Sequence, residues 1–143
     1  MIEIQNRQTR YRVNKRALTR LAGDLARHYR VRAPELGLAF VGESSIRRLN
    51  RVYRRKDKVT DVLSFPLGCR AADGKFYLGD IIIAPARAAR YARQRGHGLE
   101  RELGILVIHG FLHLIGFGHS RYRIEKEEER ARELFLGRGK RER

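Results

Sequence analysis

The chain has 143 residues, a length typical of one domain. Its 32 Lys and Arg residues outnumber its 16 Asp and Glu residues, so the formal net charge is +16. This excess predicts a polyanionic partner, RNA or DNA, because cations that neutralise phosphates release counterions. A merely basic surface and an anionic membrane surface are weaker alternatives.

Three features argue against secreted and membrane proteins. Cys69 is the only cysteine, which excludes an intrachain disulfide and fits a reducing compartment. The first residues lack the basic and then apolar plan of a signal peptide. The most apolar window, residues 103–117, contains two histidines and is too short to span a membrane. We therefore expect a soluble, cytoplasmic protein with no membrane partner.

The first third of the chain predicts two strands, each followed by a helix. Alternation over residues 2–5 predicts a short first strand. Asn14 is a suitable cap for a helix whose apolar residues recur at helical spacing up to Tyr29. The apolar run 36–41 predicts a buried strand, and Ser44 or Ser45 is expected to cap the next helix.

Two further strands follow, separated by a loop or turn over residues 68–75. The third strand is predicted over residues 62–65, where Pro66 stops it, and the fourth over residues 76–83. Asp80 places a charge within that apolar fourth strand. Either it faces an edge or a basic neighbour, or it faces an active site, because buried carboxylates are costly and tend to be functional. We keep Asp80 as a candidate catalytic residue.

Three helices complete the pattern. One begins at Pro85, a long one runs from Leu99 to Gly116, and the last begins after Ser120. Four strands with about five helices predict an α+β fold, in which the helices pack on a small mixed sheet. We expect a single domain over residues 1–137 and a basic C-terminal tail over residues 138–143.

The most basic segment lies in and after the second helix. A solvated helix face and a phosphate-binding surface both explain its charge. The candidate nucleic-acid-binding residues there are Arg51, Arg54, Arg55, Lys56 and Lys58.

Three histidines gather around the end of the long helix. His109 and His113 are four residues apart and so share one helix face, and a turn at Gly116 can carry His119 back toward them. Three imidazoles with no fourth protein ligand nearby are typical of a catalytic metal site with an open position, and zinc is the leading candidate. The other two histidines, His28 and His97, are predicted to lie on the surface.

The spacing of these histidines matches the zincin pattern H-E-x-x-H-x-x-G-x-x-H, and the predicted metal helix is zincin-like. The departure is Gly110, which stands where zincin peptidases have the glutamate that acts as general base. Hydrolysis remains possible, because a metal lowers the pKa of water to about 7. The proton must then be handled by another group or by the substrate's own hydroxyl.

Three stretches together resemble the YbeY family of bacterial endoribonucleases, which take part in small-subunit rRNA maturation and ribosome quality control. They are residues 109–119, 49–66 and 78–81. The resemblance implies one zinc ion bound by His109, His113 and His119, and a functional arginine at Arg54. This chain has Gly118 just before the third histidine, where the family usually has an aspartate. Asp80 and Asp61 are the candidates to take over the role of that aspartate. Val59 stands where the family commonly has a proline.

Three hypotheses follow for the function. The first is a zinc-dependent, single-strand-specific endoribonuclease acting in 3′ end maturation of small-subunit rRNA, with Arg54 gripping a phosphate. The second is a ribosome-associated assembly factor that binds RNA and the small subunit or its assembly factors, with a non-catalytic zinc. The third, a zinc metallopeptidase, is disfavoured by Gly110.

Overall fold

The computed structural model describes residues 1–117 and 121–137. In chain order the elements are β1 (Ile2–Asn6), α1 (Lys15–His28), β2 (Pro34–Phe40), α2 (Glu43–Arg54), β3 (Val62–Arg70), β4 (Phe76–Ile83), α3 (Pro85–Arg95), α4 (Leu99–Leu114) and α5 (Arg121–Leu136). Four strands and five helices within the described residues confirm the predicted α+β fold.

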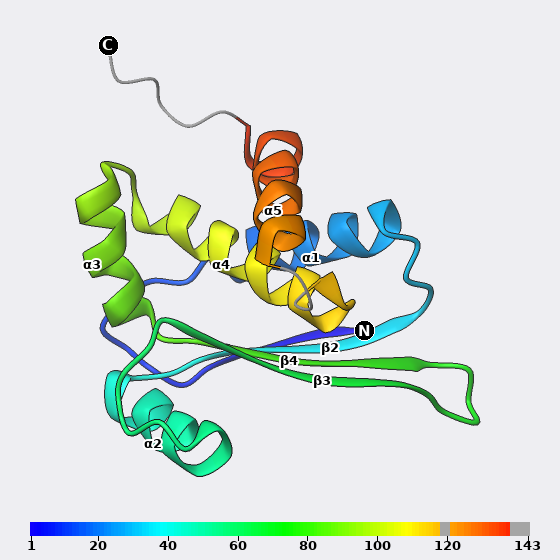
Figure 1. Ribbon diagram of the computed structural model, residues 1–143, viewed down its shortest axis with the longest axis horizontal. Helices are drawn as coiled ribbons and strands as arrows, with labels where there is room; N and C mark the ends of the chain where they lie inside the picture. The colour runs from blue at the N-terminus through cyan, green and yellow to red at the C-terminus, as the bar shows by residue number, and fades with distance from the viewer. Residues whose placement is uncertain (118–120, 138–143) are drawn as a thin grey trace.

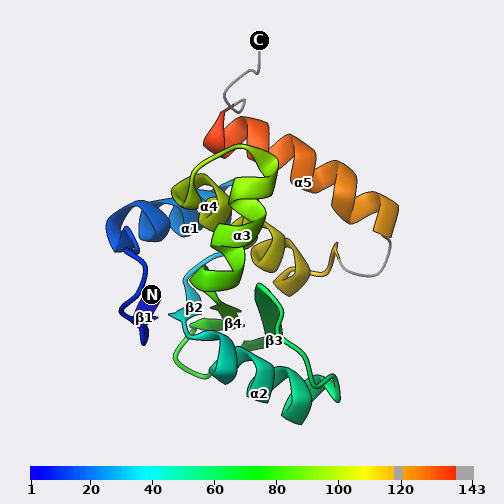
Figure 2. The same cartoon turned by 90° about the vertical axis from the view of Figure 1, so that its left-hand side faces the viewer.

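The sheet is mixed and has the strand order β1-β2-β4-β3. Strands β1, β2 and β4 are parallel, whereas β3 pairs antiparallel with β4 at the edge. Helices α1, α4 and α5 lie on one side of the sheet, and α2 lies on the other (Figures 1 and 2). The edge strand β3 therefore has α4 on one side and α2 on the other.

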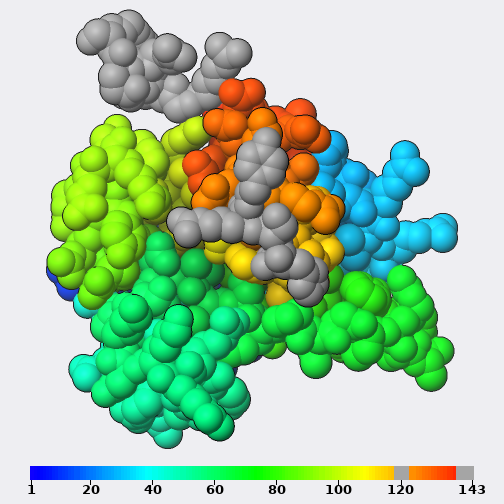
Figure 3. Space-filling model, in the orientation of Figure 1, coloured from blue at the N-terminus to red at the C-terminus, as the bar shows by residue number. Residues whose placement is uncertain are grey.

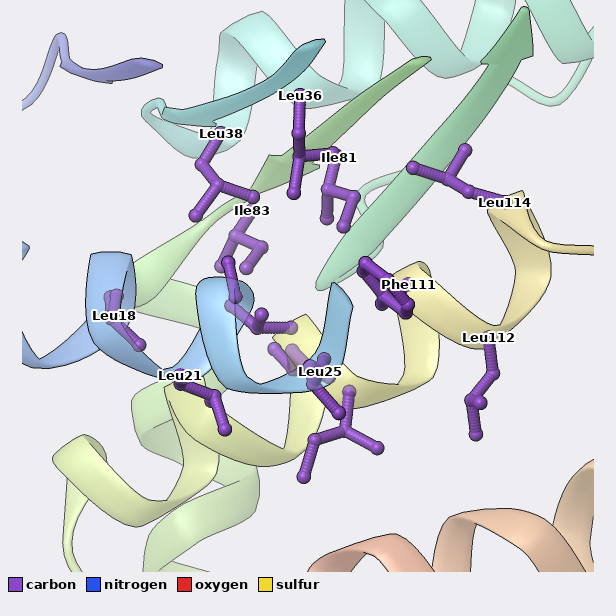
Figure 4. Close-up of a cluster of buried hydrophobic side chains, with 14 of the residues drawn as sticks. Leu18, Leu21, Leu25, Leu36, Leu38, Ile81, Ile83, Phe111, Leu112 and Leu114 are labelled. Carbon is purple, nitrogen blue, oxygen red and sulfur yellow. The ribbon is translucent and has the colours of Figure 1, made fainter. Parts of the chain in front are cut away.

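The main core fills the space between α4, α1 and the inner face of the sheet (Figure 4). Eleven of the 16 residues of α4 are buried, which explains why its sequence is apolar all round rather than striped. Leu25, Ile81 and Phe111 are among the side chains fully buried there. A smaller cluster under α2 contains Val41, Ile46, Leu63 and Ala84. The central helix is thus held rigidly above the sheet.

Helix α4 lies directly against β4 at Gly110. A Cβ atom built on Gly110 would lie 2.8 Å from Cγ2 of Ile81 and 3.0 Å from its Cδ1. Real Cβ atoms essentially never come that close, so glycine lets the helix settle on the strand. Position 110 consequently faces the sheet.

Several boundaries follow the sequence closely. Asn14 caps α1, where its side chain accepts a hydrogen bond from the Ala17 backbone N–H at 3.0 Å. Pro85 occupies the first turn of α3, and α4 begins at Leu99 as predicted. Gly116 adopts a left-handed conformation with φ of 103° just beyond the end of α4.

Two local predictions were wrong. The cap of α2 is Gly42, with no side-chain hydrogen bond, so neither Ser44 nor Ser45 caps the helix. Strand β3 also does not stop at Pro66 but continues to Arg70, with a register shift between Pro66 and Cys69. Proline is tolerated there because β3 is an edge strand, where a missing N–H need not break a ladder bond.

Candidate functional site

Two of the three predicted histidine ligands stand side by side on α4. The ring centroids of His109 and His113 are 4.4 Å apart. Both rings line a cavity of about 220 Å³ between α4 and the edge strand β3, together with Arg54, Val62, Leu63, Ser64 and Pro66. We call this space the histidine cavity. The four-residue spacing therefore does bring both imidazoles to one recess.

A buried carboxylate, that of Glu128, orients the ring of His109. Glu128 of α5 forms a hydrogen bond with Nδ1 of His109, and its other oxygen accepts one from Nη2 of Arg132 at 3.1 Å. Burial alone would raise the pKa of Glu128, but the hydrogen bond from His109 and the nearby charges of His109 and Arg132 leave it lowered. A carboxylate bonded to Nδ1 leaves Nε2 of His109 free to face the cavity.

The surroundings of His113 keep its imidazole neutral. Burial lowers the pKa of His113, and the charges of His109 and Arg54 lower it further against an opposing effect of Glu128. Neutral imidazole is the form that binds metal ions. His113 thus meets the chemical requirement for a metal ligand.

Arg54 reaches the histidine cavity from the opposite side of the sheet. It is the last residue of α2, and its Nη2 donates a hydrogen bond to the Ser64 carbonyl oxygen at 2.5 Å. Its Cζ atom lies 5.6 Å from the centre of the Phe65 ring. These contacts carry the guanidinium around the edge strand and place a cation beside His109 and His113.

The loop after Arg54 is fixed by a buried asparagine. Asn50 Nδ2 donates a hydrogen bond to the Lys58 carbonyl oxygen at 3.0 Å, and the Asn50 carbonyl accepts one from the Lys56 N–H at 3.2 Å. Asn50 is only 3% exposed, so its amide has a structural role. It holds the chain that leads from Arg54 to β3.

The other predicted nucleic-acid-binding residues do not line the cavity. Arg51, Arg55, Lys56 and Lys58 are exposed at the end of α2, which forms the lower left part of the molecule in Figure 3. Asp57 forms ion pairs with Arg47 at 2.9 Å and with Arg51 at 3.8 Å. Part of the basic charge is therefore neutralised, and Arg54 alone of the five joins the histidines.

Asp80 lies away from the histidines. Asp80 is exposed, and its partners in the sheet register are Gly37 of β2 and Phe65 of β3. Its side chain points to the opposite face from that of Ile81, which packs under α4. Burial against its own sheet raises the pKa of Asp80, and Glu3 of β1 raises it further. Strict alternation along β4 sends Ile81 inward and Asp80 outward. The structure therefore gives no support to Asp80 as a catalytic residue.

Asp61 is an acid whose charge interacts with that of His109. Burial raises its pKa, the charge of Glu102 adds to that effect, and the charge of His109 opposes it. Asp61 directly precedes β3, and Val62, the first residue of β3, lines the cavity. Of the two alternative acids predicted from the sequence, Asp61 is thus the one near the site.

His97 was predicted to be a surface residue, and this prediction was wrong. Its Nε2 lies 2.6 Å from Oε1 of Glu102, while Nη1 of Arg95 donates to the other oxygen at 2.5 Å. Glu102 is fully buried. Arg95 is the last residue of α3 and His97 lies in the turn before α4, so this group fixes the start of α4.

The third predicted ligand, His119, lies outside the described residues, as does Gly118. Within residues 1–117 and 121–137, no group of three or more His, Cys, Asp or Glu side chains is placed to hold a metal ion. Glu128 is the functional candidate that sequence reasoning missed. Its one sequence signal is Arg132 four residues later, a spacing that also suits an ordinary helix surface pair.

Within the described residues, no helix is both long and apolar enough to cross a membrane.

Comparison with known proteins agrees over most of the chain. The model of the family "Endoribonuclease YbeY" matches residues 3–137. An Endoribonuclease YbeY from Staphylococcus carnosus is 46% identical over 107 residues, covering 71% of this chain and 70% of that protein. One from Aquifex aeolicus is 45% identical over 100 residues, covering 70% of this chain and 65% of that protein.

A solved structure has a similar fold. The solution structure of TM1509 from Thermotoga maritima superposes with a TM-score of 0.65 at 28% identity and covers 96% of this chain and 90% of that one. The sequence motifs, the shared architecture and the family match lead to one conclusion: the chain belongs to the YbeY endoribonuclease family.

Proposed function

We propose that this protein is a zinc-dependent, single-strand-specific endoribonuclease that hydrolyses phosphodiester bonds. Its proposed role is in 3′ end maturation of small-subunit rRNA and in ribosome quality control, in the cytoplasm. The observation that carries the proposal is the position of Arg54, which lines the same cavity as His109 and His113. A cation beside paired imidazoles suits a phosphate substrate.

The histidines fit a zinc ion. Glu128 bonds Nδ1 of His109 and leaves Nε2 for a metal ion, and the lowered pKa of His113 favours its neutral form. We propose that His109, His113 and His119 hold one zinc ion, the third position following from the sequence pattern. Bound zinc supplies a Lewis acid that polarises a phosphate oxygen and lowers the pKa of water.

Arg54 binds and orients the scissile phosphate in this proposal. Its hydrogen bond to the Ser64 carbonyl and its position over Phe65 fix the guanidinium before RNA arrives. A preorganised cation stabilises charge that develops on phosphate oxygens in the transition state. The side chain thus acts on the reacting group and adds little to general affinity.

A single strand suits the surroundings of the cavity. Tyr53 is 64% exposed beside Arg54, and its ring centroid lies 5.5 Å from that of Phe65. An exposed aromatic ring stacks on an unpaired base, whereas the bases of a duplex are already stacked. This pair beside the phosphate-binding arginine supports selectivity for unpaired RNA.

Proton transfer needs a group other than residue 110. Gly110 has no side chain, and its position faces Ile81 rather than the cavity. We propose Asp61, or the 2′-hydroxyl of the RNA, as the group that handles the proton. Asp61 is supported by its raised pKa and by its charge interaction with His109.

An assembly factor that binds RNA and the small subunit or its assembly factors is the second candidate. It is favoured by one observation: no carboxylate among the described residues lines the histidine cavity. In that case zinc is structural, and the exposed cations after α2 share the RNA contact. A metallopeptidase gains no support, because a glutamate at position 110 would collide with β4.

The experiment compares wild type with His113→Ala, purified in parallel to control for contaminating ribonuclease. Zinc content and cleavage of a single-stranded RNA are measured, with a duplex of the same sequence as the substrate control. Wild type is expected to bind about one zinc ion and cut the single strand, and His113→Ala to lose both. Cleavage by a zinc-free His113→Ala sample at the wild-type rate would refute the proposal.

A further inference from the structure

A second cavity lies beside the last turn of α4. Its volume is about 450 Å³, and Arg30, Arg32 and Arg70 surround a floor that includes Phe76, Leu78 and Ile115. We call it the arginine pocket. In Figure 3 the light-blue connection between α1 and β2 lies above the green β3–β4 hairpin at the right of the molecule, beside the yellow end of α4.

The arginine pocket neighbours the histidine cavity along two elements. His113 lines the cavity, and the next residues of the chain, Leu114 to Gly116, line the pocket. On β3, Pro66 lines the cavity and Arg70 the pocket. Four residues span at most about 13 Å at roughly 3.3 Å per residue, and the strand is irregular between them. A chain molecule held in the cavity has only a short distance to reach the pocket.

The charge of the pocket is not neutralised from within. In the part of the chain that the structure describes, no Asp or Glu lines it. In residues 1–117 and 121–137, neither Arg30 nor Arg32 has an ion pair. Arg70 is prepositioned, because its Cζ lies 5.3 Å from the Phe76 ring centre and its Nη1 donates to the Gly74 carbonyl at 2.6 Å. Three cations over an apolar floor match a ligand with an anionic group and a flat apolar part.

Arg30 occupies a position that would ordinarily be glycine. It follows the end of α1 in a left-handed conformation with φ of 59°. The Val31 N–H bonds to the Ala26 carbonyl at 2.8 Å, which is the helix-ending motif that usually carries glycine there. An arginine in this conformation lowers the stability of the fold, and residues in strained conformations concentrate at functional positions.

We infer that the arginine pocket binds one nucleotide of a single-stranded RNA whose scissile phosphate lies in the histidine cavity. The base rests on the floor that includes Phe76, Leu78 and Ile115, and the arginines bind its phosphate. This inference rests on the proposed function, since it names a second contact of the same substrate. It adds a subsite at a fixed distance from the point of cleavage.

The test is a titration of the isotope-labelled full chain with uridine and adenosine monophosphate, followed by amide chemical shifts. Saturable shifts are expected at Val31, Leu78 and Ile115. The matching nucleoside and inorganic phosphate are the control ligands, each expected to bind more weakly.

Arg32→Gln and Arg70→Gln should each weaken binding about tenfold, because a hydrogen bond to a charged group is lost. Arg93→Gln, a change at an exposed residue of α3 that does not line the pocket, should leave binding unchanged.

Arg30→Gly separates a binding role from a structural one. Glycine adopts φ of 59° freely, so this variant should melt at a higher temperature and yet bind the mononucleotide more weakly. Unchanged nucleotide binding by Arg30→Gly would overturn the inference. Equal shifts with inorganic phosphate alone, or an equal loss in Arg93→Gln, would overturn it too, because either result indicates general attraction of anions.

The inference and the proposed function fail separately. Mononucleotide binding needs no cleavage, so shifts at the pocket in a protein that cuts no RNA would support the pocket and refute the nuclease. Cleavage of RNA by a protein with no shifts at the pocket would support the nuclease and overturn the pocket.

Discussion

His109 and Glu128 form the contact that most directly shapes the candidate metal site. The carboxylate bonded to Nδ1 fixes the tautomer and the orientation of the ring, and Arg132 in turn holds the carboxylate. Partners of this kind raise the affinity of a ligand for its metal without touching the metal.

Replacing Glu128 with Gln should weaken zinc binding about 10- to 100-fold, because the carboxylate that orients the His109 ring is lost. Competition with a zinc chelator measures the affinity directly. Glu129→Gln is the matched control, since Glu129 is the exposed neighbour on the same helix. Equal zinc affinities of the two variants would show that Glu128 only helps α5 to pack.

Asp61 is predicted to be a source of instability at neutral pH. Its pKa in the folded state is raised, mainly by burial, above the value of about 3.9 in an unfolded chain. The ionised form therefore costs stability above the folded pKa, and the cost vanishes below about pH 3.9, where both states are protonated.

Asp61→Asn should accordingly raise the free energy of unfolding at pH 7, and the gain should disappear near pH 3. Urea unfolding of the metal-free protein at both pH values provides the measurement. If Asp61 also transfers the proton, the same variant loses kcat on RNA while KM stays close to the wild-type value. A variant less stable than wild type at pH 7 would refute the buried-charge account.

At the scale of the helix, Gly110 sets how closely α4 can lie on β4. A methyl group there would meet Ile81 at 2.8 Å. The close approach leaves His109 and His113, on either side of position 110, facing the edge of the sheet.

Gly110→Ala should destabilise the protein by about 1–3 kcal/mol through overpacking, less a gain of roughly 1 kcal/mol in helix propensity. The cost should shrink in an Ile81→Ala background, which removes the clashing atoms. Gly104→Ala is the control on the same helix, because its new methyl group meets the movable end of Leu136. Equal costs for Gly110→Ala in both backgrounds would contradict the packing argument.

Elements were predicted well where one local signal decided them. Asn14, Pro85 and the apolar periodicity of the helices act within a few residues, so the sequence alone locates them. Pro66 misled because its effect depends on whether β3 is a central or an edge strand, which the sheet order decides. The same limit applies to Gly42, whose capping role carries no side-chain signal.

The site was predictable in part for a related reason. His109, His113 and Arg54 belong to motifs, but only the fold brings α2 and α4 to one edge strand. Glu128 lies 19 positions from His109, and His97 is half-buried against Glu102, so neither role is visible from spacing. Whether Asp80 faces an edge or the site could not be decided from the sequence, because alternation along β4 depends on which face α4 covers.

At the scale of the whole molecule, the +16 charge is spread over surfaces with different roles. Asp57 partly neutralises the charge on α2, and the arginine pocket carries three cations. Among the residues that the structure describes, Arg54 is the one cation that lines the histidine cavity. General attraction to RNA is thus shared among many residues, whereas the chemistry is proposed to depend on one arginine.

The most direct test of that claim is single-turnover cleavage of a single-stranded RNA by Arg54→Ala, with zinc content and RNA affinity measured on the same samples. The account predicts normal zinc content, a salt slope of binding reduced by about one, and a cleavage rate lowered at least about 100-fold. Arg93→Ala should cleave at the wild-type rate. Wild-type cleavage by Arg54→Ala, with only its RNA affinity reduced, would contradict the account.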